Sequence, residues 1–377
     1  MKPFDVFEKF PIHIITGKGC YIYDDKGNEY LDMYCGHGVT SIGHGHPHYV
    51  WNVTEQLSSL VFYSNTVENK LQEALASKLG EVSGYADYQV FFSNSGAEAN
   101  ENAIKLASFH TGRKKVIALS NSFHGRTSAA VSATDTGALR APVNESDNFV
   151  FTPFNDIGSL RKQLETRLYC AVIIEGIQGV GGVYVPNDDF LSEMKNICEQ
   201  TGTLLILDEI QSGYGRTGKF FAHQHTDVRP DLITVAKGIA NGYPMAATLI
   251  HESIKPKKGM LGSTFGGNHL GCMAALSVLD VIVNENLVEN AAEVGNYLLD
   301  ELSKIPEIMS VRGRGLMIGI EFENPVEELR EKLLLNEHIF TGASGSYIIR
   351  LLPPLTFSKE QANKFLDKFK RLLKNEK

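Results

Sequence analysis

The chain is poor in cysteine, with five residues of this type among 377. They are odd in number and widely spaced, and no two form a CxxC pair (Cys20, Cys35, Cys170, Cys198 and Cys272). A disulfide framework would need paired cysteines, and a zinc site would need them at close spacing. The sequence therefore indicates neither, and it favours a reducing compartment.

Long apolar runs are also missing. No stretch is apolar enough to span a bilayer, and the N-terminus lacks the charged segment and apolar run of a secretory signal, so we expect an uncleaved, cytoplasmic protein. Positive charge is scarce, since 36 lysines and arginines stand against 44 aspartates and glutamates, a formal net charge of −8. Such a surface disfavours nucleic acid and anionic membranes as partners. Any bound phosphate must therefore be held locally.

What the chain has is the alternation typical of an α/β protein. From about residue 60 to residue 250, short apolar runs that end in polar residues alternate with amphipathic stretches, which indicates βαβ units and a largely parallel sheet. The stretch 190–198 repeats its apolar residues at helical spacing and should cover one face of that sheet. The expected strands are 89–93, 115–119, 170–175, 203–208, 231–236 and 245–250.

Further structure is expected on either side of this region. Residues 17–32 alternate turn residues with apolar pairs, which predicts small antiparallel strands. After Gly271, a long helical stretch leads into a second α+β unit. We therefore divide the chain into an N-terminal segment that joins the small domain (1–55), a large domain (56–265) and a C-terminal small α+β domain (266–377).

Two of the expected strands lead into residues that can carry chemistry. The apolar run 203–207 is followed by Asp208 and Gln211, and the run 231–236 is followed by Lys237. Ligands of open α/β sheets bind at the carboxyl ends of the strands, so a carboxylate and an amine are expected at one edge. Burying both there is costly unless the protein uses them. Either residue alone would be an ordinary strand end at the surface.

A third segment predicts the start of a helix that suits an anion. Ser95 is a typical N-cap, and Gly96 and Ala97 would leave their N–H groups free where the helix dipole favours negative charge. The segment lacks the lysine of a P-loop, which disfavours nucleoside triphosphate chemistry. Capped helices after strands are common, so this segment alone would indicate no ligand.

Together, an amine, a carboxylate and a phosphate-binding helix start at one sheet edge are the parts that pyridoxal 5'-phosphate needs. Lys237 would hold the cofactor aldehyde as a Schiff base and would then move a proton between the substrate carbon and the cofactor. Asp208 would keep the pyridine nitrogen protonated, so that the ring accepts electrons. Gln211 would donate a hydrogen bond to the phenolic oxygen of the ring.

Further motifs occur in the order of a known family. They are GKG and YLD within 17–32, GHGHP (43–47), NSGAEAN (94–100), FHGRT (123–127), DEIQSGYGRTG (208–218), AKG (236–238), GSTFGGN (262–268), RGRGL (312–316) and RLLPP (350–354). On these motifs the chain resembles the class III (fold-type I) aminotransferases, most closely their acetylornithine aminotransferase branch. The resemblance implies a mostly parallel, seven-stranded-type sheet flanked by helices in a large domain that binds pyridoxal 5'-phosphate. It also implies a smaller α+β domain built from both chain ends.

The resemblance also implies roles for single residues. Phe123 would stack on the cofactor ring, and Ser95, Gly96 and Ala97 would hold its phosphate. Thr264 would reach the phosphate of the neighbouring subunit. That role requires a homodimer whose active sites lie at the interface.

Two arginines and one glutamate bear on the substrate. Arg126 resembles the arginine that binds a substrate carboxylate, and Arg350 resembles the one that binds the α-carboxylate of glutamate or 2-oxoglutarate. A planar guanidinium matches a carboxylate in bidentate geometry, which a lysine does not. Surface ion pairing is the alternative for both arginines. Glu175 is expected to play a supporting role on the Arg126 side of the pocket.

The chain departs from the family pattern at one position. The family usually reads Glu-Pro-x-Gln-Gly-Glu where this chain reads EGIQGV (175–180), so Val180 stands in place of the second glutamate. In the family that glutamate pairs with the arginine matched by Arg350 while an ω-amine substrate is bound. We hypothesise that Arg350 is either neutralised by another acid or left free, which would alter the balance between ω-amino and α-amino substrates.

Three histidines at alternate positions, His44, His46 and His48, raise the question of a metal. No carboxylate or cysteine joins them locally, so we expect no metal site. The glycine fingerprint of a nicotinamide-dependent dehydrogenase is also missing.

We therefore expect the ω-amino group of an N-acylornithine, acetyl or succinyl, to pass to 2-oxoglutarate, giving glutamate and an N-acylglutamate semialdehyde, as in arginine biosynthesis. The alternative donors are ornithine and other ω-amino acids such as 4-aminobutyrate. A catalytically silent protein that binds the cofactor is a more distant alternative, which Lys237, Asp208 and both arginines disfavour.

Overall fold

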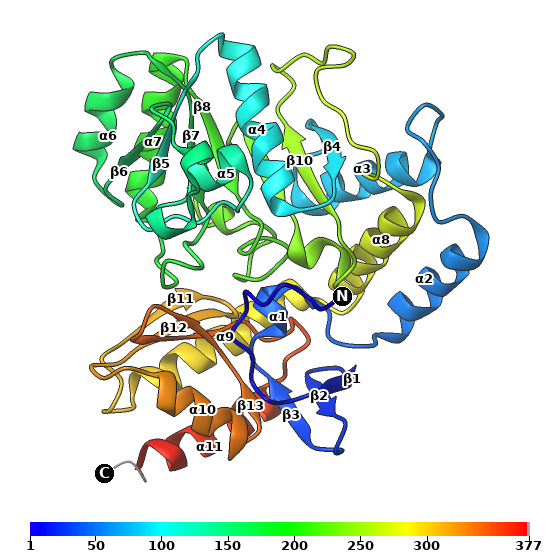
Figure 1. The fold of residues 1–377 in the computed structure, drawn as a ribbon, viewed down its shortest axis with the longest axis vertical. Helices are drawn as coiled ribbons and strands as arrows, with labels where there is room; N and C mark the ends of the chain where they lie inside the picture. The colour runs from blue at the N-terminus through cyan, green and yellow to red at the C-terminus, as the bar shows by residue number, and fades with distance from the viewer. Residues whose placement is uncertain (375–377) are drawn as a thin grey trace.

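The computed structural model describes residues 1–374, in which the largest sheet has seven strands (Figure 1). Their order across the sheet is β4-β10-β9-β8-β7-β5-β6. β10 is antiparallel to both of its neighbours, and the other pairings are parallel. The mostly parallel sheet expected from the sequence is therefore confirmed. The strands are β4 (Gln89–Ser93), β5 (Lys115–Leu119), β6 (Phe149–Thr152), β7 (Tyr169–Glu175), β8 (Leu204–Asp208), β9 (Leu232–Val235) and β10 (Ala246–Ile250).

Helices cover both faces of this sheet, because the central strands are apolar on both faces. Every residue of β7, β8 and β9 is buried. α7 (Asp188–Thr201) packs its apolar side on one face, beside Val172 and Leu205, as its helical spacing predicts. α4 (Gly96–Thr111) packs on the opposite face, beside the alternate residue Ala171.

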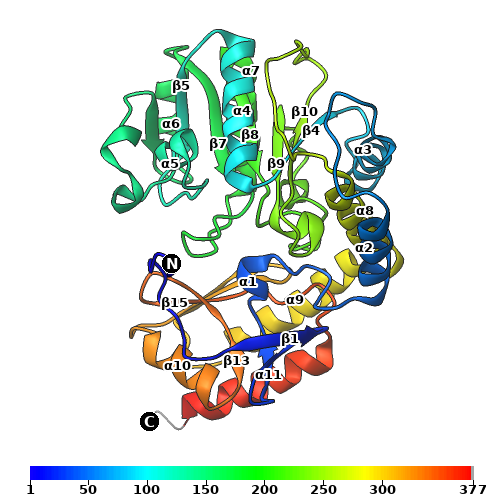
Figure 2. The same ribbon diagram turned by 45° about the vertical axis from the view of Figure 1, so that its right-hand side comes forward.

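The second part of the molecule is built from both ends of the chain. Figure 2 shows the blue N-terminal strands beside the orange and red C-terminal elements. β1 (Ile14–Lys18), β2 (Tyr21–Asp24) and β3 (Glu29–Asp32) form the expected antiparallel ladder, and β3 pairs in parallel with β13 (Ile339–Phe340). This pairing supports our proposal that the N-terminal segment joins the small domain.

A third sheet in this part has the order β11-β12-β15-β14. Its strands are β11 (Ser310–Arg314), β12 (Met317–Glu321), β14 (Gly342–Ser344) and β15 (Ile348–Leu351). Every pairing in this sheet is antiparallel. β15 is buried along its whole length and carries Arg350, so this sheet places a cation deep in the protein.

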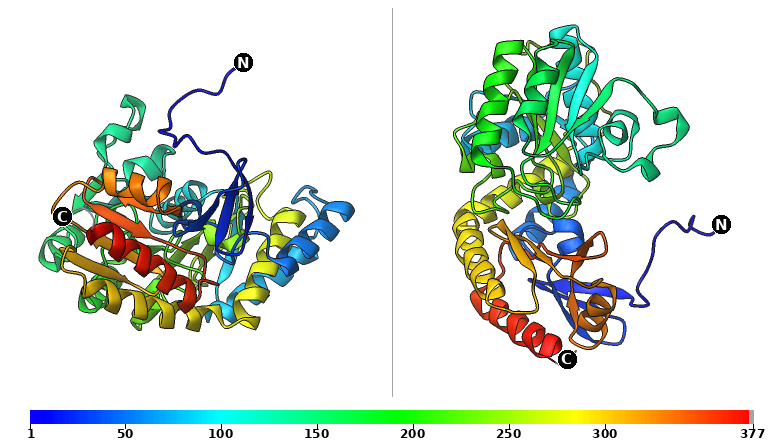
Figure 3. Two further views of the ribbon diagram at one scale, coloured as in Figure 1. Left: turned by 90° about the horizontal axis from the view of Figure 1, so that it is seen from below. Right: turned by 90° about the vertical axis from the view of Figure 1, so that its left-hand side faces the viewer.

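The remaining α-helices connect or follow these strands along the chain. They are α1 (Cys35–Gly38), α2 (Pro47–Ser59), α3 (Lys70–Ser83), α5 (Ser128–Ser132), α6 (Ile157–Leu164), α8 (His269–Asn284), α9 (Leu287–Ser303), α10 (Glu327–Leu335) and α11 (Lys359–Lys374). Figure 3 shows the first residues of the chain extending away from the rest. Within residues 1–374 no single helix has the length and apolar character to cross a bilayer; α8 and α9 meet those criteria only as a pair bent by 64°.

Candidate active site

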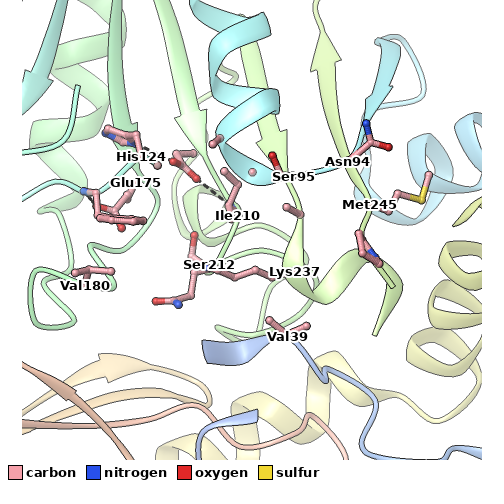
Figure 4. A pocket seen from close by; sticks show the side chains of 18 of the residues that line it. Val39, Asn94, Ser95, His124, Glu175, Val180, Ile210, Ser212, Lys237 and Met245 are labelled. Carbon is pink, nitrogen blue, oxygen red and sulfur yellow. Dashed lines mark hydrogen bonds and ion pairs between the residues drawn. The ribbon is translucent and has the colours of Figure 1, made fainter. Parts of the chain in front are cut away.

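A cavity of about 290 Å³ lies at the carboxyl ends of the central strands of the large sheet (Figure 4). Glu175 ends β7, Asp208 ends β8, and Lys237 follows β9. The parallel register places Glu175 beside Asp208, and Asp208 beside Thr234 of β9. All three ionisable side chains line the cavity, so the carboxylate and the amine expected at one sheet edge do meet there.

Asp208 is held by three hydrogen-bond donors. Its side chain is buried, and Oδ2 accepts from Asn100 Nδ2 at 2.8 Å and from His124 Nδ1 at 2.7 Å. Oδ1 accepts from the backbone N–H of Ile210 at 3.0 Å. An ionised carboxylate only accepts hydrogen bonds, so the contact between His124 Nδ1 and Asp208 Oδ2 requires the proton of His124 to sit on Nδ1. The orientation of the carboxylate is thereby fixed.

His124 and Asn100 support the site, and the sequence reasoning missed both. His124 Nε2 is buried and has no partner within residues 1–374. Asn100 is fully buried; its amide also donates to the carbonyl of His124 at 2.8 Å, and its Oδ1 accepts from Thr234 Oγ1 at 2.7 Å. One amide thus ties α4 to β9 and to Asp208. Both residues lie inside motifs noted above, FHGRT and NSGAEAN, but side-chain direction is not visible in a motif.

Lys237 begins the short 3₁₀ helix η4 (Lys237–Ala240) with a backbone φ of +48°. A non-glycine residue in this left-handed region is strained, and such strain gathers at functional sites. In the described part of the chain, Lys237 Nζ makes no hydrogen bond or ion pair. Burial lowers its pKa to about 8, against the opposing attraction of Asp208 and Glu175. About a tenth of the amine is therefore neutral, and nucleophilic, at pH 7, far more than for an ordinary lysine.

The N-terminus of α4 forms another wall of the cavity. Ser95 is the N-cap of this helix, as predicted, and its side chain accepts from the backbone N–H of Glu98 at 3.2 Å. Ser95, Gly96 and Ala97 all line the cavity. A side chain at Gly96 would lie 2.8 Å from the side chain of Ile210, so glycine allows this close packing. The helix start therefore presents its dipole to the cavity, which favours an anion.

Glu175 is buried in the wall beside Phe123, which also lines the cavity. Its carboxyl accepts from the backbone N–H groups of Phe123 at 3.0 Å and Gly179 at 2.9 Å. Burial raises its pKa to about 7; His124 opposes this shift and Asp208 adds to it. A carboxyl and an amine whose pKa values both lie near neutrality in one cavity are typical of a catalytic site.

Three of the predicted site residues, Arg126, Thr264 and Arg350, lie outside the residues that line this cavity. Arg126 and Thr264 are both exposed at the surface. Their predicted roles toward a substrate carboxylate and a neighbouring subunit stay predictions.

Arg350 is 3% exposed and is bound by neutral groups. Its Nε donates to the carbonyl of Ala343 at 2.9 Å, and Nη2 donates to Tyr34 Oη at 2.8 Å. Nη1 makes a longer contact of 3.4 Å with Gln211 Oε1, while Gln211 Nε2 donates to the carbonyl of His37. Among residues 1–374 no carboxylate forms an ion pair with Arg350. The structure thus favours an arginine without an acid partner.

The three histidines of residues 44–48 form three separate pairs. His44 contacts Asp32 at 2.8 Å, His46 contacts Glu285 at 2.9 Å, and His48 contacts Asp280 at 3.1 Å. Each ring therefore has its own carboxylate partner, and these contacts supply a structural role for the segment.

Comparison with known proteins gives consistent matches over nearly the whole chain. The family model "Aminotransferase class-III" matches residues 6–373. The acetylornithine aminotransferase of Nitrosomonas europaea is 38% identical over 98% of this chain and 96% of its own length. That of Methanothermobacter thermautotrophicus is 39% identical over 96% and 93%. A structure of Toxoplasma gondii ornithine aminotransferase, described with partial occupancy of PLP at its active site, superposes with a TM-score of 0.92 at 30% identity, covering 98% of this chain and 91% of that one.

Proposed function

The chain belongs to the class-III aminotransferases and uses pyridoxal 5'-phosphate, and we propose that its amino donor is an N-acylornithine. The ω-amino group would be transferred to 2-oxoglutarate, giving glutamate and an N-acylglutamate semialdehyde. The names of the relatives support this donor. The observation that carries the reaction type is the Lys237 amine, which lies in one cavity with Asp208 and has no hydrogen-bond or ion-pair partner among residues 1–374.

The residues of the cavity fit the cofactor. The N-terminus of α4 suits its phosphate, Asp208 suits its ring nitrogen, and the Lys237 amine suits its aldehyde. Phe123 lies in the cavity wall, where it would contact the ring face. When bound, pyridoxal 5'-phosphate supplies an aldehyde that reacts with amines and a ring that accepts the electron pair released at the substrate carbon.

Lys237 would take a proton from the substrate carbon that bears the amine and would return it to the cofactor. A pKa of about 8 suits this task, because a base works best when its pKa lies near the working pH. Its amine is free of hydrogen-bond partners in residues 1–374, so no contact must break before it moves.

Asp208 would hold a proton at the pyridine nitrogen. Asn100, His124 and the Ile210 N–H fix this carboxylate, so it does not need to reorient during the reaction. Gln211 lies in the cavity wall and has one amide hydrogen beyond the bond to His37, which would serve the phenolic oxygen.

Arg126 and Arg350 would bind substrate carboxylates, with Glu175 in a supporting role. Arg350 supports this assignment because it is buried and lacks an acid partner among the described residues. A bound carboxylate would supply the missing negative charge.

We further propose that the enzyme is a homodimer in which Thr264 reaches the phosphate of the partner's cofactor. Thr264 is exposed and lies between Ser263 and Phe265 in a loop. Phe265 is 60% exposed, and its ring centroid lies 5.4 Å from that of Phe62. Exposed aromatic residues beside a polar one suit a protein interface. Sedimentation should give twice the mass of one chain, and a monomer would contradict the proposal.

Lys237→Ala tests the reaction, and a panel of donors tests the substrate. The wild type should convert N-acetylornithine or N-succinylornithine with 2-oxoglutarate, and Lys237→Ala should lose at least about a hundredfold in kcat. Lys304→Ala, which removes an exposed lysine, is the control and should behave as wild type. Conversion of free ornithine in preference to both acylated donors would favour the second candidate, which the similar ornithine aminotransferase structure supports.

A further inference from the structure

The buried Arg350 forms an ion pair with no carboxylate of residues 1–374. Burial lowers its pKa, and the nearby Tyr34 and Glu175 oppose that change. An arginine keeps its proton even so. The protein therefore holds a cation at this position by neutral contacts alone, and a buried cation without a partner is unfavourable.

The hydrogen bonds of Arg350 leave a pattern that fits a carboxylate. A guanidinium has five N–H groups, one on Nε and two on each terminal nitrogen. Ala343 takes the one on Nε, Tyr34 takes one on Nη2, and Gln211 takes one on Nη1. One N–H remains on each terminal nitrogen, and two such groups are what a bidentate carboxylate requires.

Tyr34 is built into this arrangement. Its ring lies 5.5 Å from the guanidinium carbon and 4.8 Å from the ring of His37. Gly342 pairs with Arg350 between β14 and β15, and a side chain at Gly342 would overlap the Tyr34 ring. Burial raises the pKa of Tyr34, so its hydroxyl stays neutral around neutral pH and cannot cancel the charge of Arg350.

We propose that Tyr34 is a positioning residue, which holds Arg350 ready for the carboxylate of glutamate or 2-oxoglutarate in every state of the enzyme. The inference rests on the proposed function. Val180 lines the cavity with an apolar side chain, and its carbonyl accepts from Ser344, on the strand beside that of Arg350. Position 180 therefore offers Arg350 no competing carboxylate, and the substrate carboxylate takes that place.

The test uses the cofactor-loaded enzyme with glutarate, a dicarboxylate that has neither an amine nor a keto group. Tyr34→Phe keeps the ring but removes the hydroxyl, so the guanidinium loses one restraint. The glutarate inhibition constant and the KM for the acceptor 2-oxoglutarate should both rise about three- to tenfold, with kcat within about twofold. Tyr30→Phe, which removes a hydroxyl bonded to Asp24 instead, is the matched control and should leave both constants unchanged.

Val180→Glu gives a second, independent measurement if Tyr34→Phe does not fold. A carboxylate on this wall would compete for Arg350, so glutarate should inhibit less, and the ratio of the specificity constants for N-acylornithine and glutamate should rise. Unchanged glutarate inhibition in a folded Tyr34→Phe enzyme, or an unchanged ratio in Val180→Glu, overturns the inference. Absence of any ω-transamination in the wild type would instead overturn the proposed function, because glutarate binding does not depend on the donor.

Discussion

Glu175 should make the stability of the cofactor-free protein depend on pH, and Glu175→Gln tests this. Burial raises the pKa of its carboxyl from the ordinary 4.5 to about 7. The folded protein therefore keeps a proton that the unfolded chain has already lost between these two pH values. Unfolding then releases a proton, so stability is fully present below pH 4.5, falls as pH rises, and levels off above about pH 7.

The size of this effect follows from the two pKa values. Their separation corresponds to about 3 kcal/mol in the free energy of unfolding. Lys237, whose pKa is about 8, stays mostly charged in both states below pH 7 and adds little to this slope. Urea unfolding of the cofactor-free wild type between pH 5 and pH 8 should show the decline.

Glu175→Gln removes the titration, but the amide N–H₂ of the glutamine would point toward the backbone N–H of either Phe123 or Gly179. The variant should therefore be less stable by about 1–3 kcal/mol where the wild type holds its proton. Its stability should lack the decline between pH 5 and pH 7 that belongs to this carboxyl. The slope is the readout, and parallel curves for wild type and variant would refute the assigned pKa.

Two further predictions concern residues that support the site. Asn100→Ala would remove hydrogen bonds to Asp208, His124 and Thr234, so the free energy of unfolding measured in urea should fall by about 3–5 kcal/mol. A loss below about 1 kcal/mol would contradict the assigned network. Gly179→Ala would place a methyl group against Gln211 Oε1, so Gln211 must move away from Arg350. The KM for the acceptor 2-oxoglutarate should then rise, while the free energy of unfolding changes by at most about 1–3 kcal/mol. An unchanged KM would show that the contact between Gln211 and Arg350 has no role in substrate binding.

The edge of the sheet that carries the site could be predicted from the sequence. β8 is apolar up to its last residue, Asp208, and β9 is apolar except for Thr234 and is followed two residues later by Lys237. The rule that ligands bind at the carboxyl ends of parallel strands converts a position in the sequence into a position in space. Ser95 was predictable for a similar reason, because helix capping is a local property of the chain.

The contacts around these residues could not be predicted in the same way. Tyr34 precedes Arg350 by 316 residues and reaches it only because the two chain ends share one part of the fold. Asn100 and His124 meet Asp208 across 108 and 84 residues. The sequence pattern also missed β6, a four-residue edge strand whose first three residues are half-buried. Tertiary packing decides each of these, and local periodicity carries no record of it.

The charges in and beside the cavity explain why an acidic protein can bind anionic ligands there. Lys237 and Arg350 are both cationic at moderate pH, whereas Glu175 holds its proton below a pH of about 7, which leaves Asp208 as the carboxylate fixed by donors. The helix dipole of α4 adds to the positive potential. The chain carries a formal net charge of −8, so this potential is local and is set by burial. Anions that enter the cavity offset the cost of burying these cations, so the stability of the site should depend on the ligands that it binds.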